Sequence, residues 1–286
     1  MNYLNNFVAY LKVERDLSIH TIAGYTTDMK KFFNFITTNV EEVTTSDVRT
    51  FIAHLSDQGL KRSSINRAVC SINAYYKYLI EVEKVMIKSP ATEIKIGKRE
   101  KSLPKALSES DVMKLLSTAS LDSIKSRLYI ELLYGLGGRV SEIASLRVED
   151  IDFNENYVRL VGKGNKERHN PIHEGCIRLI EKYMTAYHIQ SGYLFPHRFD
   201  KTRHITREAI FMKVKGLAVK ANIDKSLVSP HVFRHSFATA LLENGCDMAI
   251  VQEFLGHEDI ATTKIYAHVT RGNKAKNFKN FHPLAQ

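Results

Sequence analysis

Two short segments place cationic side chains where they could handle a phosphate group. In LLYGLGGRVSEIASL, Arg139 follows a run of glycines and precedes Glu142 by three residues, so the two side chains can meet on one helical face. In SPHVFRHSFATALLENG, His231 and Arg234 lie three residues apart at the start of an apolar helix. An arginine fork binds two phosphate oxygens, and an imidazole donates or accepts a proton near neutral pH. Taken singly, each pair also fits a surface ion pair or a structural histidine.

Two further segments carry single reactive side chains. Lys163 lies in GKGNKER, a glycine-flanked turn, where it is either a solvated lysine or a mobile cation that reaches a phosphate or protonates a leaving oxygen. The spacing of a Walker-type phosphate loop is absent. In VQEFLGHEDIATTKIYAHVT, Gly256 ends a helix, His257 follows it, and Tyr266 belongs to the next short helix.

The composition favours a polyanionic partner. The 286 residues include 41 Lys and Arg against 31 Asp and Glu, a net charge of +10, which indicates a nucleic-acid partner or simply a basic protein.

Cys70, Cys176 and Cys246 form no CxxC pair, which argues against a disulfide framework and a zinc site. No signal peptide or apolar stretch of about 18 residues is present, so we predict a cytoplasmic protein without a membrane segment. We also expect no metal and no cofactor.

The N-terminal third is predicted to be a small all-α domain, residues 1–87. Helical spacing indicates helices from about Phe7 to Glu14 and over 21–35, a third that Ser46 caps, and a fourth that Ser63 and Ser64 open. Residues 88–106 contain prolines and basic residues but no regular period, which indicates a basic linker that could lie along a phosphate backbone.

Residues 107–286 are predicted to form a second, mostly helical domain. Ser108 caps its first helix, and 124–134 indicate a buried helix that ends at Gly135. Alternating residues then predict a three-stranded antiparallel meander, with strands at 152–153, at 157–161 and up to Ile172. The predicted fold is therefore mainly α, with one small β-meander.

The ordered set of these residues resembles the tyrosine recombinases, and the length and N-terminal helical domain resemble their Xer-type branch. The set consists of Arg139, Lys163, His231 with Arg234, LGH at 255–257, and Tyr266. The resemblance covers essentially the whole chain. Gly138 departs from it, because family members usually carry a larger apolar residue there, and a glycine at this position could loosen the start of the Arg139 helix.

The resemblance implies catalytic roles without a metal. Arg139 and Arg234 would clamp the non-bridging oxygens of a DNA phosphodiester, with a further hydrogen bond from His257. Tyr266 would attack the phosphorus, leaving a 3′-phosphotyrosine and a free 5′-hydroxyl. His231 would serve as general base and Lys163 as general acid, and Glu142 would orient the arginine.

The resemblance also implies how the protein works on DNA. The two domains would close around duplex DNA as a C-shaped clamp at a specific site, and four protomers would assemble on two sites. The C-terminal tail, with Phe278 and Phe281, would dock on the neighbouring protomer, and a DNA translocase could activate the complex.

Several alternatives stay open at this point. The expected activity is resolution of chromosome or plasmid dimers, and the alternative within the family is integration of a mobile element. A type IB topoisomerase shares the tyrosine chemistry but needs no partner site. A DNA-binding regulator on a degenerate recombinase scaffold would have lost side chains, whereas all six expected active-site side chains are present.

Overall fold

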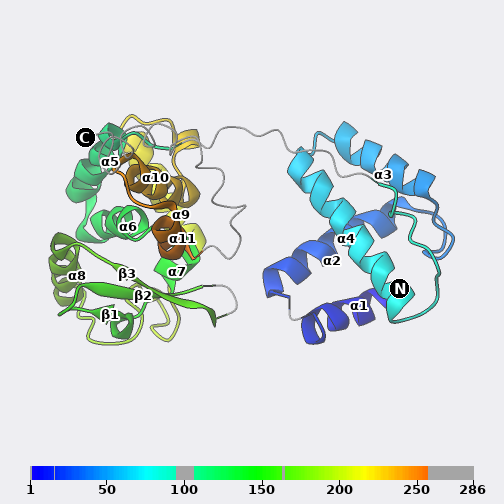
Figure 1. The fold of residues 1–286 in the computed structure, drawn as a ribbon, viewed down its shortest axis with the longest axis horizontal. Coiled ribbons are helices and arrows are strands. Elements are labelled where there is room, and N and C mark those ends of the chain that lie inside the picture. Colours follow the sequence, from blue (N-terminus) through cyan, green and yellow to red (C-terminus); the bar gives the residue numbers. More distant parts are fainter. Residues whose placement is uncertain (1, 16, 95–105, 163–164, 257–286) are drawn as a thin grey trace, which may run out of the picture. The chain divides into compact units, whose positions relative to one another are not determined.

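The computed structural model divides the chain into two compact units, Met1–Ser102 and Leu103–Gln286 (Figure 1). The structure describes residues 2–15, 17–94, 106–162 and 165–256. None of the helices in these ranges is long and apolar enough to cross a membrane.

The first unit is a bundle of four helices, as the helical spacing predicts. Its helices are α1 (Asn2–Val13), α2 (Ile19–Phe35), α3 (Thr45–Asp57) and α4 (Arg62–Glu81). α4 contacts the other three. Aromatic rings fill the space between them: Phe7 packs edge-on against Tyr75 at 5.3 Å between ring centroids, and Phe32 packs against Phe51 at 5.1 Å. Burial of these apolar faces holds the helices together.

The prediction that Ser46 caps the third helix is wrong. Thr44 is the N-cap: its hydroxyl accepts a hydrogen bond from the backbone N–H of Asp47, and the Asp47 carboxylate accepts one from the backbone N–H of Thr44 at 2.8 Å. This reciprocal capping box gives the backbone N–H groups of Thr44 and Asp47 hydrogen-bond partners, whereas Ser46 lies inside the helix.

The second unit combines seven α-helices with one small sheet in its described part. Its elements are α5 (Glu109–Asp122), α6 (Ile124–Gly135), α7 (Val140–Ala144), η1 (Val148–Asp150), β1 (Ile151–Asp152), β2 (Tyr157–Val161), β3 (Glu167–Pro171), α8 (Glu174–Ala186), α9 (Arg207–Lys220), η3 (Lys225–Leu227), α10 (Pro230–Glu243) and α11 (Met248–Leu255). Ser108 caps α5, as predicted.

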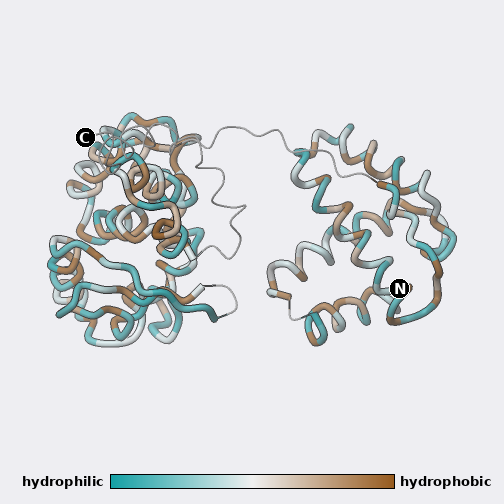
Figure 2. Tube along the Cα trace, in the orientation of Figure 1, coloured by the Kyte–Doolittle hydropathy of each residue, from teal (hydrophilic) through white to brown (hydrophobic). Residues whose placement is uncertain are grey.

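α6 is the central helix of this unit. It contacts five other helices, α5, α7, α8, α9 and α10, and Leu128, Ile130, Leu132 and Leu133 are fully buried. A helix that packs on several sides must be apolar on several sides, which explains the apolar residues between the polar ones of this helix; along the described part of the chain, hydrophobic and hydrophilic residues alternate within the helices (Figure 2). The residues at the end of α6 are therefore held in place by a helix that is packed on several sides.

The sheet is the predicted antiparallel meander, in the order β1, β2, β3. Its first strand begins one residue earlier than predicted, at Ile151. In the register of β2 and β3, Val158 pairs with Asn170 and Leu160 with Arg168. Because paired residues point to the same face of a sheet, two polar side chains of β3 lie beside the buried Val158 and Leu160.

Candidate active site

Arg139 lies at the N-cap of α7, immediately after the glycine-rich turn that ends α6. Its Nη1 donates to Glu142 Oε1 at 2.8 Å, and its backbone N–H donates to Glu142 Oε2 at 2.7 Å. The predicted pairing of Arg139 with Glu142 is therefore present. The Arg139 side chain is 36% exposed whereas that of Glu142 is 3% exposed. The buried carboxylate therefore binds one side of the guanidinium and leaves the rest accessible to solvent.

A second arginine holds the same carboxylate. Arg168 of β3 donates from Nη1 to Glu142 Oε1 at 3.0 Å and from Nη2 to Oε2 at 2.7 Å. Burial raises the pKa of Glu142, but the hydrogen bonds and charge of Arg168, together with the bonds from Arg139, outweigh burial and leave this pKa below its ordinary value. Glu142 thus stays ionised at neutral pH and carries two guanidinium partners.

Arg234 joins the turn after α6 to the end of α11. Its Nη1 donates to the backbone carbonyl of Gly137 at 2.8 Å, and its Nη2 donates to the carbonyl of Leu255. The residue is 7% exposed. Because Gly137 precedes Arg139 by two residues, these bonds hold Arg234 against the turn that leads into Arg139.

His231 lies in the first turn of α10, where Ser229 is the N-cap and Pro230 the first helical residue. It is exposed while Arg234, one turn on, is buried. His231 is therefore accessible from solvent, and Arg234 lies beneath the surface in the same helix.

Lys163, His257 and Tyr266 lie outside the described residues, but the residues before the first two are described. A Cβ on Gly162 would lie 3.3 Å from Glu142 Oε1 and 3.6 Å from Arg139 Nη1. A Cβ on Gly256, which caps α11 in the left-handed conformation, would lie 3.2 Å from Arg168 Cδ. The chain therefore passes the Arg139, Glu142 and Arg168 group immediately before both positions.

The two glycines before Arg139 differ in what they require. Gly137 has φ +59°, and a Cβ there would lie 2.3 Å from the ring of Phe237. A Cβ on Gly138 would lie 2.9 Å from Ile143 Cδ1, so the side chain of Ile143 fills the space above this glycine. The α7 start keeps its cap, because the Arg139 backbone N–H is bonded to Glu142.

Gly137→Ala is expected to destabilise the protein by about 2 to 5 kcal/mol, since a side chain at positive φ costs roughly 1–2 kcal/mol and overpacking about 1–3 kcal/mol. Urea unfolding measures this. Gly135→Ala is the matched control: Gly135 ends α6 with no atom near its added Cβ, so the change should stabilise by up to about 1 kcal/mol. Equal stability of the two variants would contradict the packing described for Gly137.

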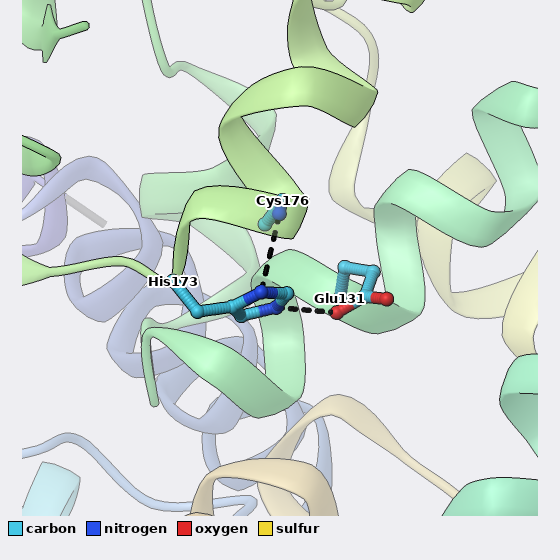
Figure 3. A group of neighbouring side chains, drawn as sticks. All are labelled: Glu131, His173 and Cys176. Carbon is cyan, nitrogen blue, oxygen red and sulfur yellow. Dashed lines mark hydrogen bonds and ion pairs between the residues drawn. The ribbon is translucent and has the colours of Figure 1, made fainter.

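Glu131, His173 and Cys176 form a separate group of side chains with metal-ligand chemistry (Figure 3). His173 is the N-cap of α8: its Nδ1 accepts from the backbone N–H of Cys176 at 3.2 Å, and its Nε2 bonds Glu131 Oε2 at 3.0 Å. Burial raises the pKa of the Cys176 thiol, which opposes the thiolate that a metal needs. These contacts make the group a helix cap that ties α8 to α6.

Sequence reasoning did not identify Arg168 and Asn170 as parts of this site. Asn170 Nδ2 donates to the carbonyls of Leu136 at 2.8 Å and Phe254 at 2.9 Å. The available signal is the composition of β3, whose inward positions are both polar. A strand that places Arg and Asn beside a core must supply partners for them.

Comparison with known proteins identifies the family. Residues 105–272 match the model of the phage integrase family, and residues 4–83 match its N-terminal SAM-like domain. The tyrosine recombinase XerD of Halalkalibacterium halodurans is 39% identical over 99% of this chain and 98% of its own, and that of Staphylococcus aureus is 36% identical over 99% of both.

Solved structures agree with this assignment. The XerA recombinase is 28% identical, with a TM-score of 0.55 over 99% of both chains. A XerH site-specific recombinase bound to a palindromic difH substrate shares the fold with a TM-score of 0.78 at 19% identity, over 96% of this chain and 84% of its own. The chain belongs to the phage integrase family, and the predicted resemblance to Xer-type tyrosine recombinases is confirmed.

Proposed function

We propose that this chain cuts and rejoins duplex DNA at a specific site through a 3′-phosphotyrosine on Tyr266. Arg139 and Arg234 hold the non-bridging oxygens of the scissile phosphate, and His257 adds a hydrogen bond. His231 takes the phenol proton, since a tyrosine with a pKa of about 10 is mostly neutral at pH 7. Lys163 protonates the leaving 5′-oxygen, and the roles reverse on rejoining.

One observation supports this proposal most strongly. The buried Arg234 bonds the Gly137 carbonyl in the turn that leads into Arg139, and the chain passes the Arg139, Glu142 and Arg168 group immediately before Lys163 and His257. Positions that are far apart in the sequence thus converge on a single group of guanidiniums. Such preorganised cations stabilise a developing phosphorane without reorganisation at the moment of reaction.

A DNA substrate agrees with the charge and with the relatives. The net charge of +10 favours a polyanion. The XerH structure holds its difH substrate, and a Tn1549 transposon integrase with a TM-score of 0.76 at 18% identity holds transposon end DNA. In this proposal the two domains, residues 1–87 and 107–286 joined by the basic linker 88–106, close around the duplex as a clamp.

The proposed biological role is resolution of chromosome or plasmid dimers in the cytoplasm. Identity of 36–39% to XerD recombinases along nearly the full length supports it, whereas the Tn1549 and lambda integrase structures share 18% and 14% identity and only the fold. Assembly of four protomers through the C-terminal tail, and activation by a DNA translocase, complete the proposal.

The test is covalent trapping on nicked duplexes from a random library, in EDTA. Wild-type protein should give an SDS-resistant adduct whose protease digest contains a 3′-phosphotyrosyl peptide, and sequencing the trapped DNA gives the site. Relaxation of any supercoiled plasmid without a partner site would indicate a type IB topoisomerase instead. Tight binding without any adduct would indicate a DNA-binding regulator.

A further inference from the structure

The inward face of β3 carries a charge where a strand beside a core normally carries an apolar residue. Arg168 lies opposite Leu160 in the β2–β3 register, and its side chain is 9% exposed. Removing a guanidinium from water costs several kcal/mol unless its partners are well placed. Its contacts therefore indicate what it does for the site.

Arg168 connects the carboxylate of Glu142 at the start of α7 with the end of α11. Both of its Nη atoms bind Glu142, and its Nε donates to the carbonyl of Phe254 in the last turn of α11 at 2.8 Å. Phe254 precedes His257 by three residues in the sequence. One guanidinium thus bonds both the carboxylate that orients Arg139 and the helix end that leads to His257.

The contact with α11 is close as well as hydrogen-bonded. Gly256 has φ +60°, and a Cβ there would lie 3.2 Å from Arg168 Cδ and 3.3 Å from Nη1. Glycine adopts this positive φ without strain and leaves the arginine its place against the chain. The cation also lies at the C-terminal end of a helix, where the helix dipole favours positive charge.

The charges in this group do not cancel. Arg139 and Arg168 are two guanidiniums around the single carboxylate of Glu142, so the group keeps one net positive charge. Without Arg168, Glu142 would neutralise Arg139 alone, and the field that Arg139 directs at a phosphate would fall. The carboxylate would also lose the fork that fixes its plane.

We propose that Arg168 is a positioning residue of the recombination site. It keeps Arg139 electrostatically active by sharing Glu142, and it fixes the α11 end relative to that pair. The inference rests on the proposed function, and Arg168 acts through Glu142 and Phe254 rather than by contact with DNA.

The test is single-turnover cleavage of a nicked duplex at saturating protein, with DNA affinity and thermal unfolding measured alongside. Arg168→Gln should slow cleavage about 10- to 100-fold, as expected for a residue behind the contacting group, with DNA affinity within about threefold because phosphate contacts remain. Arg168→Lys, which keeps the charge but not the three-point geometry, should recover part of the rate.

Arg159→Gln is the matched control, because Arg159 of β2 also binds a buried carboxylate, Asp150, through two nitrogens, at 3.0 and 2.6 Å. It should lose stability and keep its cleavage rate. A double cycle with Glu142→Gln separates coupling from general damage: coupled residues give a double variant no slower than the worse single one.

Three results would overturn the inference while leaving the function intact, provided that wild type forms an adduct. Arg168→Gln could cleave within twofold of wild type, or it could lose no more cleavage rate than Arg159→Gln. The third result is fully multiplicative losses of cleavage rate in the cycle with Glu142→Gln. Absence of an adduct with both wild type and Arg159→Gln would instead overturn the proposed function and the inference with it. Should Arg168→Gln fail to fold, Arg168→Lys carries the comparison.

Discussion

Tyr266→Phe is expected to abolish covalent adduct formation while leaving DNA affinity within about twofold, because phosphate contacts rather than one phenol supply most of the affinity. Removing the hydroxyl removes the only atom that can form the phosphotyrosine at this position. The measurement is adduct yield on the trapped duplexes, together with a gel-shift titration of the same variant.

Four buried tyrosines make poor substitutes for the nucleophile. Burial raises the pKa of Tyr75, Tyr76, Tyr129 and Tyr183, which lowers the fraction of phenolate and the access to a phosphate. Tyr187→Phe is the control, since Tyr187 is 45% exposed at the end of α8 and should retain full adduct yield. An adduct that persists in Tyr266→Phe would disprove the assignment, and the digest would identify the tyrosine that carries the DNA.

Local patterns predicted much of the fold and one contact of the site. The apolar run of α6, the meander, the Ser108 cap and the left-handed Gly256 each depend on residues within about one turn or one hairpin. Arg139 and Glu142 are three residues apart at the start of α7, so the local geometry of the helix N-terminus brings them together. The Thr44 cap could also have been predicted from Asp47, three residues later, since Arg49 occupies the corresponding position after Ser46.

The remaining contacts of the site depend on how distant segments pack. Arg168 meets a carboxylate 26 residues before it and a carbonyl 86 residues after it. Arg234 bonds a carbonyl 97 residues before it, in the turn after α6. Backbone carbonyls leave no mark in a sequence, so these partners follow only from the positions of α6, β3 and α11. What the sequence does show is an unexplained charge on an inward strand position, and burial turns that charge into a requirement for partners.

Arg234→Lys is expected to slow cleavage by about 10² to 10³, the range for loss of one preorganised donor to an oxyanion. A lysine keeps the charge, but it cannot hold the carbonyls of Gly137 and Leu255 and also present a planar fork to a phosphate. The unpaired buried carbonyls should also cost about 1–3 kcal/mol of unfolding free energy. Single-turnover cleavage at saturating protein and urea unfolding measure the two effects separately.

The comparison with Arg139→Lys decides whether the two arginines act as one clamp. If both guanidiniums bind the same phosphate, each variant should lose cleavage rate and keep DNA affinity within a few fold, since many other phosphate contacts remain. Arg178→Gln is the control, because Arg178 is 58% exposed on α8 and bonds only Glu174 among the partners seen in the described residues. Loss of DNA binding with Arg234→Lys, beside normal turnover with Arg139→Lys, would mean that Arg234 supports the α11 end rather than the transition state, and that the clamp assignment is wrong.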